Sequence, residues 1–228
     1  MLNQKIYILK LNFSFLALAI GFFTNQGCAT NNLLKSTGIF RSGNGESMRN
    51  SALIIVDLQN DFCPKGSLAV KDGDKIIPTV NALIKKYKSL GNPIYATRDW
   101  HPSNHMSFKS SGGPWPVHCV QNTPGAAFHP DLIIDDAIVI NKGSLVDEEA
   151  YSGFNGTNLA QKLKERGVTD LTICGLATDY CVKATVLDGI NSGFTVTVIK
   201  DGIRGVNVKP EDSKKALEAM MSAGAVIK

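Results

Sequence analysis

The chain has 228 residues, of which 43% are hydrophobic and 19% charged, and its formal net charge is +4. This balance is typical of a globular protein and excludes an intrinsically disordered chain. Lys85, Lys86 and Lys88 form the densest basic group, but no aromatic side chains alternate with them as a base-stacking surface would require. We interpret them as a solvated helix face and expect no nucleic-acid partner.

The first residues have the order of features found in an export signal. Lys5 and Lys10 precede an apolar run at residues 11–23, which is too short to span a bilayer comfortably. Cys28 follows between Gly and Ala and resembles the lipidated cysteine of a bacterial lipoprotein. Residues 1–28 are therefore predicted to be a leader that would anchor an exported protein through a lipid on Cys28.

The next segment separates this leader from the remainder of the chain. Residues 29–50 are polar and rich in Asn, Ser and Gly, which predicts a tether without a fold of its own. The alternative is that translation starts at Met48, which would give a cytoplasmic protein. In either case residues 51–228 are long enough for one compact domain with a substantial core.

Residues 51–228 alternate between strand-like and helix-like patterns. A continuous apolar run, typical of a strand buried on both faces, is found at 52–56. Further short strands are predicted at 93–97, 137–141, 171–175, 194–199 and 225–227. Apolar residues at helical spacing, bounded by Gly or Pro, predict helices at 74–90, 159–166, 179–192 and 210–223. The alternation predicts an α/β domain with a six-stranded, mostly parallel sheet covered by helices on both faces.

Polar residues follow the predicted strands where ligands bind in such folds, at the carboxyl ends. Asp57 follows the first strand, Lys142 the third, and Cys181 the fourth. Because parallel strands end at one edge of the sheet, these three side chains are expected to meet there.

Cys181 is the strongest candidate nucleophile among the five cysteines. None of the cysteines forms a CxxC pair and the number is odd, which argues against a disulfide framework or a cysteine zinc site. A thiol in the first turn of a helix has its pKa lowered by the helix dipole. A buried structural cysteine is the alternative, but Asp57 and Lys142 at the same edge favour a reactive thiol, because a carboxylate can accept its proton.

Three of the four histidines lie close together in the sequence, beside an acidic residue. Asp99 and His101 are two residues apart and would point to one face if the strand continues. With His105 and His118 they could hold a divalent ion such as zinc, iron or manganese. A polar loop with clustered histidines is the alternative, which spacing alone does not exclude.

Several motifs, taken together, resemble the nicotinamidases of the isochorismatase-like cysteine hydrolase superfamily, over residues 52–228. The segments that carry the resemblance are Val56–Phe62, Asp99–His105, Trp115–Gln121, Lys142–Gly143, Tyr151–Phe154 and Gly175–Lys183. The resemblance implies hydrolysis of nicotinamide to nicotinic acid and ammonia in NAD salvage, and activity on pyrazinamide.

The resemblance also implies a role for each residue in these motifs. Asp57, Lys142 and Cys181 would form the catalytic triad, and the N–H groups of Ala177 and Cys181 the oxyanion hole, after a cis bond between Leu176 and Ala177. A divalent metal, with zinc as the first choice, would be held by Asp99, His101 and His118, with His105 as a fourth ligand. The substrate would be bound by Phe62, Trp115 and Tyr151.

Three other functions remain compatible with the sequence. A related amidase for ureido or carbamoyl compounds would keep the triad, although such relatives generally lack the Asp99 and His101 pair. A metal-dependent hydrolase would use a metal-bound water and keep its activity without Cys181. A lipoprotein that only binds a small amide would not need the whole triad. The sequence does not predict the oligomeric state.

Overall fold

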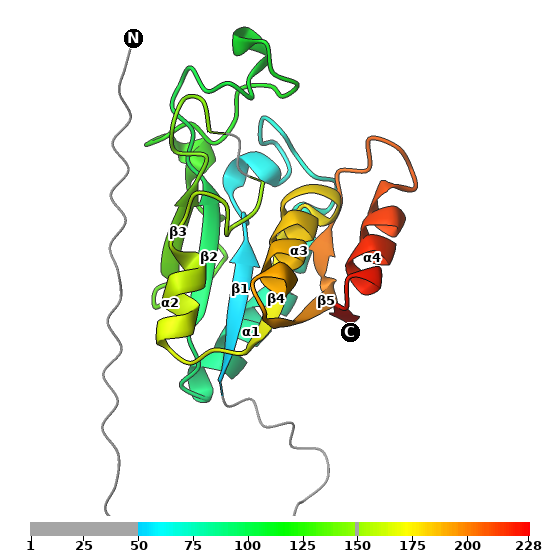
Figure 1. The fold of residues 1–228 in the computed structure, drawn as a ribbon. Helices are drawn as coiled ribbons and strands as arrows, with labels where there is room; N and C mark the ends of the chain where they lie inside the picture. The colour runs from blue at the N-terminus through cyan, green and yellow to red at the C-terminus, as the bar shows by residue number, and fades with distance from the viewer. Residues whose placement is uncertain (1–49, 149–150) are drawn as a thin grey trace, which may run out of the picture. The chain divides into compact units, whose positions relative to one another are not determined.

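The computed structural model describes residues 50–148 and 151–228, and within them the predicted α/β architecture is confirmed. The six strands are β1 (Ser51–Val56), β2 (Ile94–Asp99), β3 (Ile138–Lys142), β4 (Asp170–Leu176), β5 (Thr195–Arg204) and β6 (Val226–Ile227). They form one sheet in the order β3-β2-β1-β4-β5-β6, in which every pairing is parallel (Figure 1).

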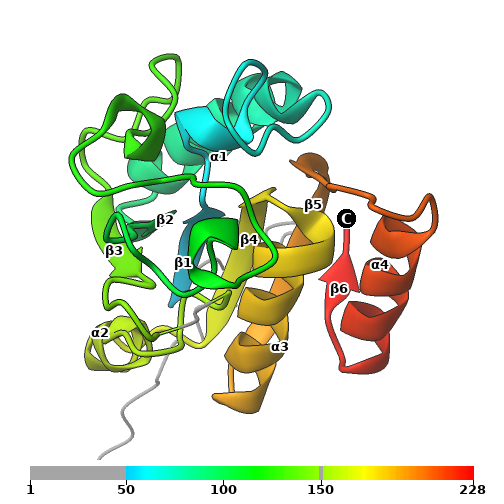
Figure 2. The same ribbon diagram turned by 90° about the horizontal axis from the view of Figure 1, so that it is seen from above.

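Four α-helices cover the two faces of this sheet unequally. They are α1 (Ile77–Ser89), α2 (Leu159–Glu165), α3 (Lys183–Asn191) and α4 (Asp212–Ser222). Helix α1 lies on one face, and α2, α3 and α4 lie on the other (Figure 2). Alternate residues of β1 supply the two cores: Ile54 packs in the cluster that includes α2, α3 and α4, and Ile55 in the cluster that includes α1. This two-sided burial explains why β1 is a continuous apolar run.

Two elements differ from the sequence prediction. The helix expected at 179–192 is preceded by a wider turn, Thr178–Val182, in which the N–H of Val182 donates to the Ala177 carbonyl at 3.1 Å. Strand β5 runs to Arg204, well past the apolar stretch from which it was predicted, and its pairing with β4 shifts register between Ile173 and Gly175. The polar residues near its end conceal this extension in the sequence.

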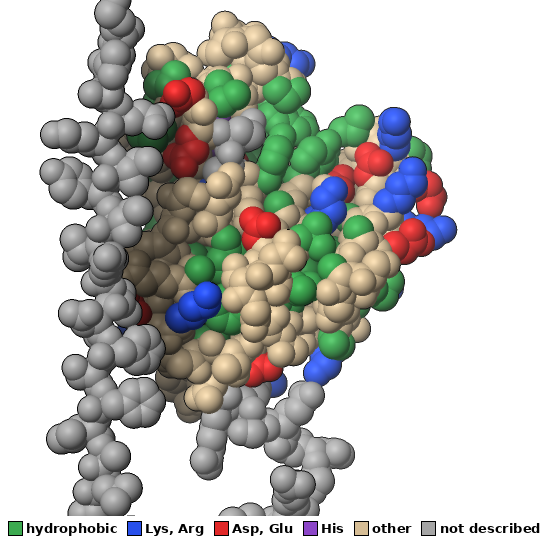
Figure 3. Space-filling view, in the orientation of Figure 1, with side chains coloured by type: hydrophobic (Ala, Val, Ile, Leu, Met, Phe, Trp, Pro, Cys, Tyr) green, Lys and Arg blue, Asp and Glu red, His purple; other side chains and the backbone are tan. Residues whose placement is uncertain are grey.

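The leader predicted at residues 1–28, with Cys28, lies outside the described residues, as does all of the predicted tether except Asn50. Among the residues that the structure describes, no helix is long and apolar enough to cross a membrane. On the face shown in Figure 3, basic and acidic side chains alternate, most densely over α4.

The carboxyl ends of β1 and β4 approach each other closely beside Asp57. Gly175 has φ +119°, and a Cβ there would lie 2.0 Å from the carbonyl oxygen of Val56, the residue before Asp57. Only glycine allows this approach, so the sequence at position 175 helps to set the distance between the strands that carry Asp57 and Cys181.

We expect Gly175→Ala to lower the free energy of unfolding by about 3 kcal/mol or more, because backbone strain and a main-chain clash act together. Gly91→Ala is the control: Gly91 also has a positive φ, +69°, but a Cβ there would have no neighbour within 4 Å. That change should cost only about 1 kcal/mol. Urea unfolding measures both, and equal losses would contradict the close approach.

Candidate active site

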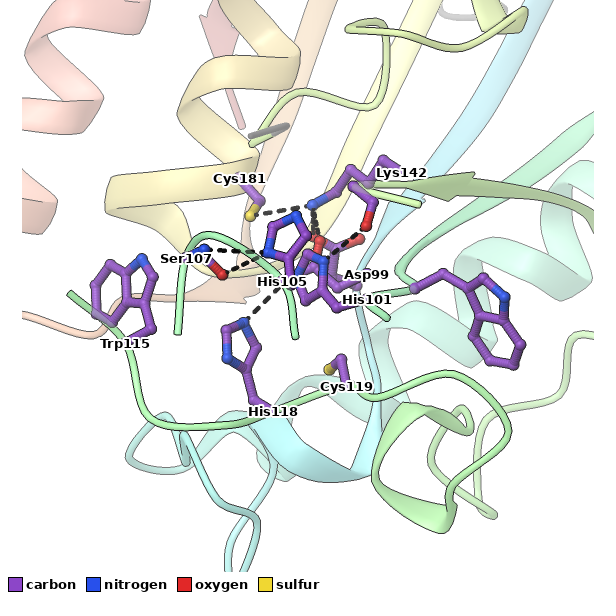
Figure 4. Close-up of polar contacts among 12 residues, drawn as sticks. Asp99, His101, His105, Ser107, Trp115, His118, Cys119, Lys142 and Cys181 are labelled. Atoms are coloured by element: carbon purple, nitrogen blue, oxygen red, sulfur yellow. Dashed lines mark hydrogen bonds and ion pairs between the residues drawn. The ribbon is translucent and has the colours of Figure 1, made fainter. Parts of the chain in front are cut away.

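A buried lysine lies at the centre of the predicted site. The Nζ of Lys142, at the end of β3, is 2.8 Å from Asp57 Oδ2, forms an ion pair with Asp99, and donates to the Sγ of Cys181 at 3.5 Å. Lys142 is only 1% exposed. The structure therefore brings together Asp57, Lys142 and Cys181 from the ends of three strands, with Asp99 from a fourth. Figure 4 shows Lys142 pointing towards Asp99 and Cys181.

The charges of this group shift the pKa of each member. Burial alone would lower the pKa of Lys142, but the charges of Asp57 and Asp99 outweigh it and hold the pKa well above its usual range. Burial raises the pKa of Asp57 and, although Lys142 opposes this, the neighbouring Asp99 charge adds to it. Asp57 is therefore a stronger base than an ordinary carboxylate, while Lys142 stays charged.

The thiol of Cys181 is not ionised in advance by this environment. Burial raises its pKa well above the usual range; Lys142 opposes the shift, and the two nearby carboxylates reinforce it. This outcome differs from the pKa lowering that we expected from a helix N-terminus, because burial and two carboxylates act more strongly than the dipole. Ionisation of this thiol would therefore need a base, and a carboxylate oxygen of Asp57 lies within 4.8 Å of the sulfur.

The turn that carries Cys181 begins at an unusual peptide bond. The bond between Leu176 and Ala177 is cis, as predicted, and it connects β4 directly to the turn Thr178–Val182. Both Ala177 and Cys181 border the same cavity. Their backbone N–H groups are thus carried by two residues that line one cavity.

Three side chains form a compact set of ligand atoms beside Lys142. One ligand atom each from Asp99, His101 and His118 lies within 4.8 Å of the other two, and all three residues are buried. The Nε2 atoms of His101 and His118 are 3.5 and 3.8 Å from Asp99 Oδ2 (Figure 4). Two imidazoles and a carboxylate suit zinc, with positions left for water or a ligand.

The hydrogen bonds of the two histidines fit a metal site. The Nδ1 of His101 is 2.8 Å from the Gly143 carbonyl oxygen, and that of His118 is 2.8 Å from the Pro116 carbonyl oxygen. A carbonyl only accepts, so each Nδ1 carries the proton and donates it. In the neutral ring this leaves the Nε2 lone pair directed towards Asp99, which is the arrangement that metal-binding histidines require.

His105, predicted as a fourth ligand, is engaged elsewhere. Its Nε2 donates to the Glu148 carbonyl oxygen at 3.0 Å, and its Nδ1, 2.8 Å from the hydroxyl oxygen of Ser107, is left to accept from that group. Both ring nitrogens are occupied, and the ring stacks on His101 with centroids 4.0 Å apart. In this geometry His105 packs against His101, and its ring nitrogens bond to Glu148 and Ser107 rather than approaching Asp99.

The second cluster of possible ligand atoms has a different explanation. Single ligand atoms of Asp57, Asp99 and Cys181 also lie within 4.8 Å of one another. However, the ammonium group of Lys142 contacts all three residues. The cation between Asp57, Asp99 and Cys181 is therefore the ammonium group of Lys142. The candidate metal ligands are Asp99, His101 and His118.

A small, mainly apolar cavity opens beside Cys181. The space is about 380 Å³, including its mouth, and its lining residues are Phe62, Leu68, Asp99, Trp115, His118, Tyr151, Ala177, Tyr180, Cys181 and Val206. The three residues predicted to bind substrate are all in this lining. Trp115 Nε1 donates to the hydroxyl of Tyr151 at 3.0 Å, so two of the aromatic walls hold each other in place.

Several residues that shape the site were not predicted from the sequence. Thr97 donates to Asp57 Oδ1 at 2.7 Å, and Gln59 holds Asp99 by bonds to both its backbone N–H and carbonyl groups, each 2.8 Å long. Thr97 precedes Asp99 by two residues in a strand, so period-two spacing could have revealed it. The contacts of Gln59 join positions forty residues apart and leave no local signal.

Residues 51–228 match the isochorismatase domain family. The chain belongs to this family. The nicotinamidase of Escherichia coli K12 is 45% identical over 199 residues, which cover 77% of this chain and 93% of that protein. A pyrazinamidase of Pyrococcus horikoshii, crystallised in complex with zinc, is 55% identical with a TM-score of 0.75, over 78% of this chain and 98% of that one.

A third relative was solved with a ligand. The structure of the yeast nicotinamidase bound to the inhibitor nicotinaldehyde is 30% identical to this chain and has a TM-score of 0.73. The similarity covers 78% of this chain and 98% of the yeast protein. Of the proteins similar to this chain, one thus binds a small pyridine compound and another binds a zinc ion.

The hydrogen bonds of the histidines lead to a test of the metal ligands. We expect His101→Ala and His118→Ala to lose tightly bound zinc, because each removes one of three donor atoms. His105→Ala should retain nearly one equivalent and weaken the affinity by about 10- to 100-fold, as loss of a supporting residue does. Elemental analysis after dialysis measures the zinc content, and its complete loss from His105→Ala would make His105 a ligand after all.

Proposed function

We propose that this protein is a nicotinamidase, which hydrolyses nicotinamide to nicotinic acid and ammonia through a thioester on Cys181 and so serves NAD salvage. The observation that carries the proposal is the group formed by Asp57, Lys142 and Cys181 at the base of an aromatic cavity. The nicotinamidases among its relatives support the choice of substrate.

In the first step Asp57 accepts the proton of Cys181 as the sulfur attacks the carboxamide carbon. The raised pKa of Asp57, caused by burial and the Asp99 charge against the opposing effect of Lys142, makes this transfer easier. Lys142 is then beside a thiolate and a neutral carboxyl group, and its charge stabilises the thiolate.

The tetrahedral intermediate that follows carries a negative oxygen. We assign its stabilisation to the backbone N–H groups of Ala177 and Cys181, which replace water as donors inside the cavity. Asp57 returns its proton to the leaving nitrogen, ammonia departs, and a thioester joins the nicotinoyl group to Cys181. Asp57 then takes a proton from water as the water attacks the thioester. It passes this proton to the departing sulfur, so that nicotinic acid and the free thiol are released and Asp57 is again ionised.

The cavity walls orient the ring for this reaction. Phe62 and Trp115 would hold the two faces of the pyridine, and Tyr151 would border its edge. Asp99, His101 and His118 would hold a zinc ion, whose open coordination position would supply a partner for the ring nitrogen and so help to orient the carboxamide. A pyrazine ring has the same size and also a nitrogen at that position, so we expect pyrazinamide to be hydrolysed too.

The proposal predicts that Cys181→Ala lowers kcat for ammonia release from nicotinamide by about 10⁴-fold or more, as loss of a nucleophile does. Cys174→Ala is the matched control. Cys174 lies within β4, where burial raises the pKa of its thiol to about 12, and its loss should leave kcat nearly unchanged. A coupled assay for ammonia with the full-length protein measures both variants.

The outcomes distinguish the competing functions. Equal turnover by the parent and Cys181→Ala would assign the chemistry to a metal-bound water. No turnover of nicotinamide by a zinc-loaded parent that cleaves a ureido compound would indicate a related amidase. Binding of nicotinamide without any turnover would favour a ligand-binding protein.

The hydrogen bond from Thr97 to Asp57 predicts the pH dependence. This bond lowers the pKa of Asp57 against the larger effect of burial, so Thr97→Val should raise the pKa further. Because activity needs ionised Asp57, it is lost as the pH falls through this pKa, and the acidic limb of kcat/KM should move to higher pH. A profile measured from pH 4 to 9 tests this, and an unmoved limb would exclude Asp57 as the titrating base.

A further inference from the structure

The cavity has a wall that the proposed reaction does not use. Val206, in the loop between β5 and α4, lines the cavity beside Leu68, and both side chains are half-buried. The strand order β2-β1-β4-β5 places the metal-ligating residues Asp99 and His101 at one side of the nucleophile strand β4. Val206, which follows β5, therefore borders the cavity on the opposite side of β4.

Asp179 holds the backbone of Val206 and Asn207 in place by two hydrogen bonds. Its Oδ1 accepts the N–H of Val206 at 2.9 Å, and its Oδ2 accepts the N–H of Asn207 at 2.8 Å. Asp179 is 5% exposed and lies two residues before Cys181. One buried carboxylate thus connects the turn that carries the nucleophile to the loop that forms the cavity wall.

The far end of this loop is fixed as well. Asn207 Oδ1 accepts the N–H of Ser213 in the first turn of α4, at 3.0 Å. A Cβ at Gly205 would lie 1.9 Å from the Ser213 hydroxyl oxygen and 3.2 Å from Asp179 Oδ1. The loop is therefore packed tightly between Asp179 and α4, and it has little room to move when a larger ligand presses on Val206.

We propose that Val206, held in position by Asp179, limits the size of the amides that the cavity accepts. The limit applies to substituents on the ring edge that faces away from the metal ligands. The proposal rests on the proposed function, because that function places the carboxamide carbon at Cys181 and the ring nitrogen towards Asp99. A substituent on ring carbon 5 of nicotinamide then points to the wall formed by Val206. Asp179 acts through Val206 and is a positioning residue.

The test compares nicotinamide with 5-methylnicotinamide as substrates of the full-length protein and of Val206→Ala. We expect Val206→Ala to raise the ratio of kcat/KM for the methylated amide over that for nicotinamide by about 10-fold, since space for one methyl group in a packed pocket is worth that much or more. The control substrate is 6-methylnicotinamide, whose methyl group lies next to the ring nitrogen. Its ratio should not change.

The results separate this inference from the proposed function. If the parent cleaves nicotinamide and Val206→Ala leaves the ratio for 5-methylnicotinamide unchanged, the size limit is overturned and the function stands. If the parent cleaves neither amide, the proposed function fails. The size limit is then read from the Kd values of the two amides by calorimetry, and an unchanged Kd ratio in Val206→Ala overturns it.

A second variant tests the role of Asp179. Asp179→Asn keeps the shape of the side chain but replaces one acceptor oxygen with an N–H donor, which cannot accept from Val206 or Asn207. It should raise KM for nicotinamide more than it changes kcat, and it should relax the discrimination against 5-methylnicotinamide. A fall in kcat with full discrimination would mean that Asp179 supports only the Cys181 turn, and would overturn its part in the inference.

Discussion

The buried ammonium group of Lys142 is the feature on which the rest of the site depends. Two carboxylates, Asp57 and Asp99, lie at its two sides in an interior where neither could stay ionised alone. With Lys142 between them, Asp99 keeps a pKa well below its usual range, despite the opposing effect of burial, while Asp57 has a raised pKa. One cation thus permits two buried carboxylates with oppositely shifted pKa values to lie side by side.

The sheet topology makes this arrangement possible. Residues far apart in the sequence meet because β3, β2, β1 and β4 are adjacent, parallel and in register at their carboxyl ends. Asp99 pairs directly with Lys142 across β2 and β3, and Val56, next to Asp57, pairs with Gly175 on β4. The small residue at Gly175 keeps these strands close enough for the groups to touch.

The fold and much of the candidate site could be predicted from the sequence. Features that depend on contacts between distant segments could not. Buried parallel strands leave continuous apolar runs, and strand ends mark the site, so the fold and the group around Lys142 were predictable. The pKa of Cys181 and the bonds of His105 were not, because both depend on neighbours that approach from distant segments. For the same reason the hydrogen bond from the Val206 N–H to Asp179 could not be predicted from the sequence.

The central claim is that Lys142 acts through its charge, and unfolding by urea at several pH values, with zinc removed by a chelator, tests it directly. We expect Lys142→Met to be less stable than the parent by about 3–5 kcal/mol at pH 7, because two buried carboxylates lose their partner. As the pH falls and these carboxyl groups become protonated, the difference should narrow. A difference that is the same at pH 4 and pH 8 would show that Lys142 contributes by packing alone, and would contradict the account.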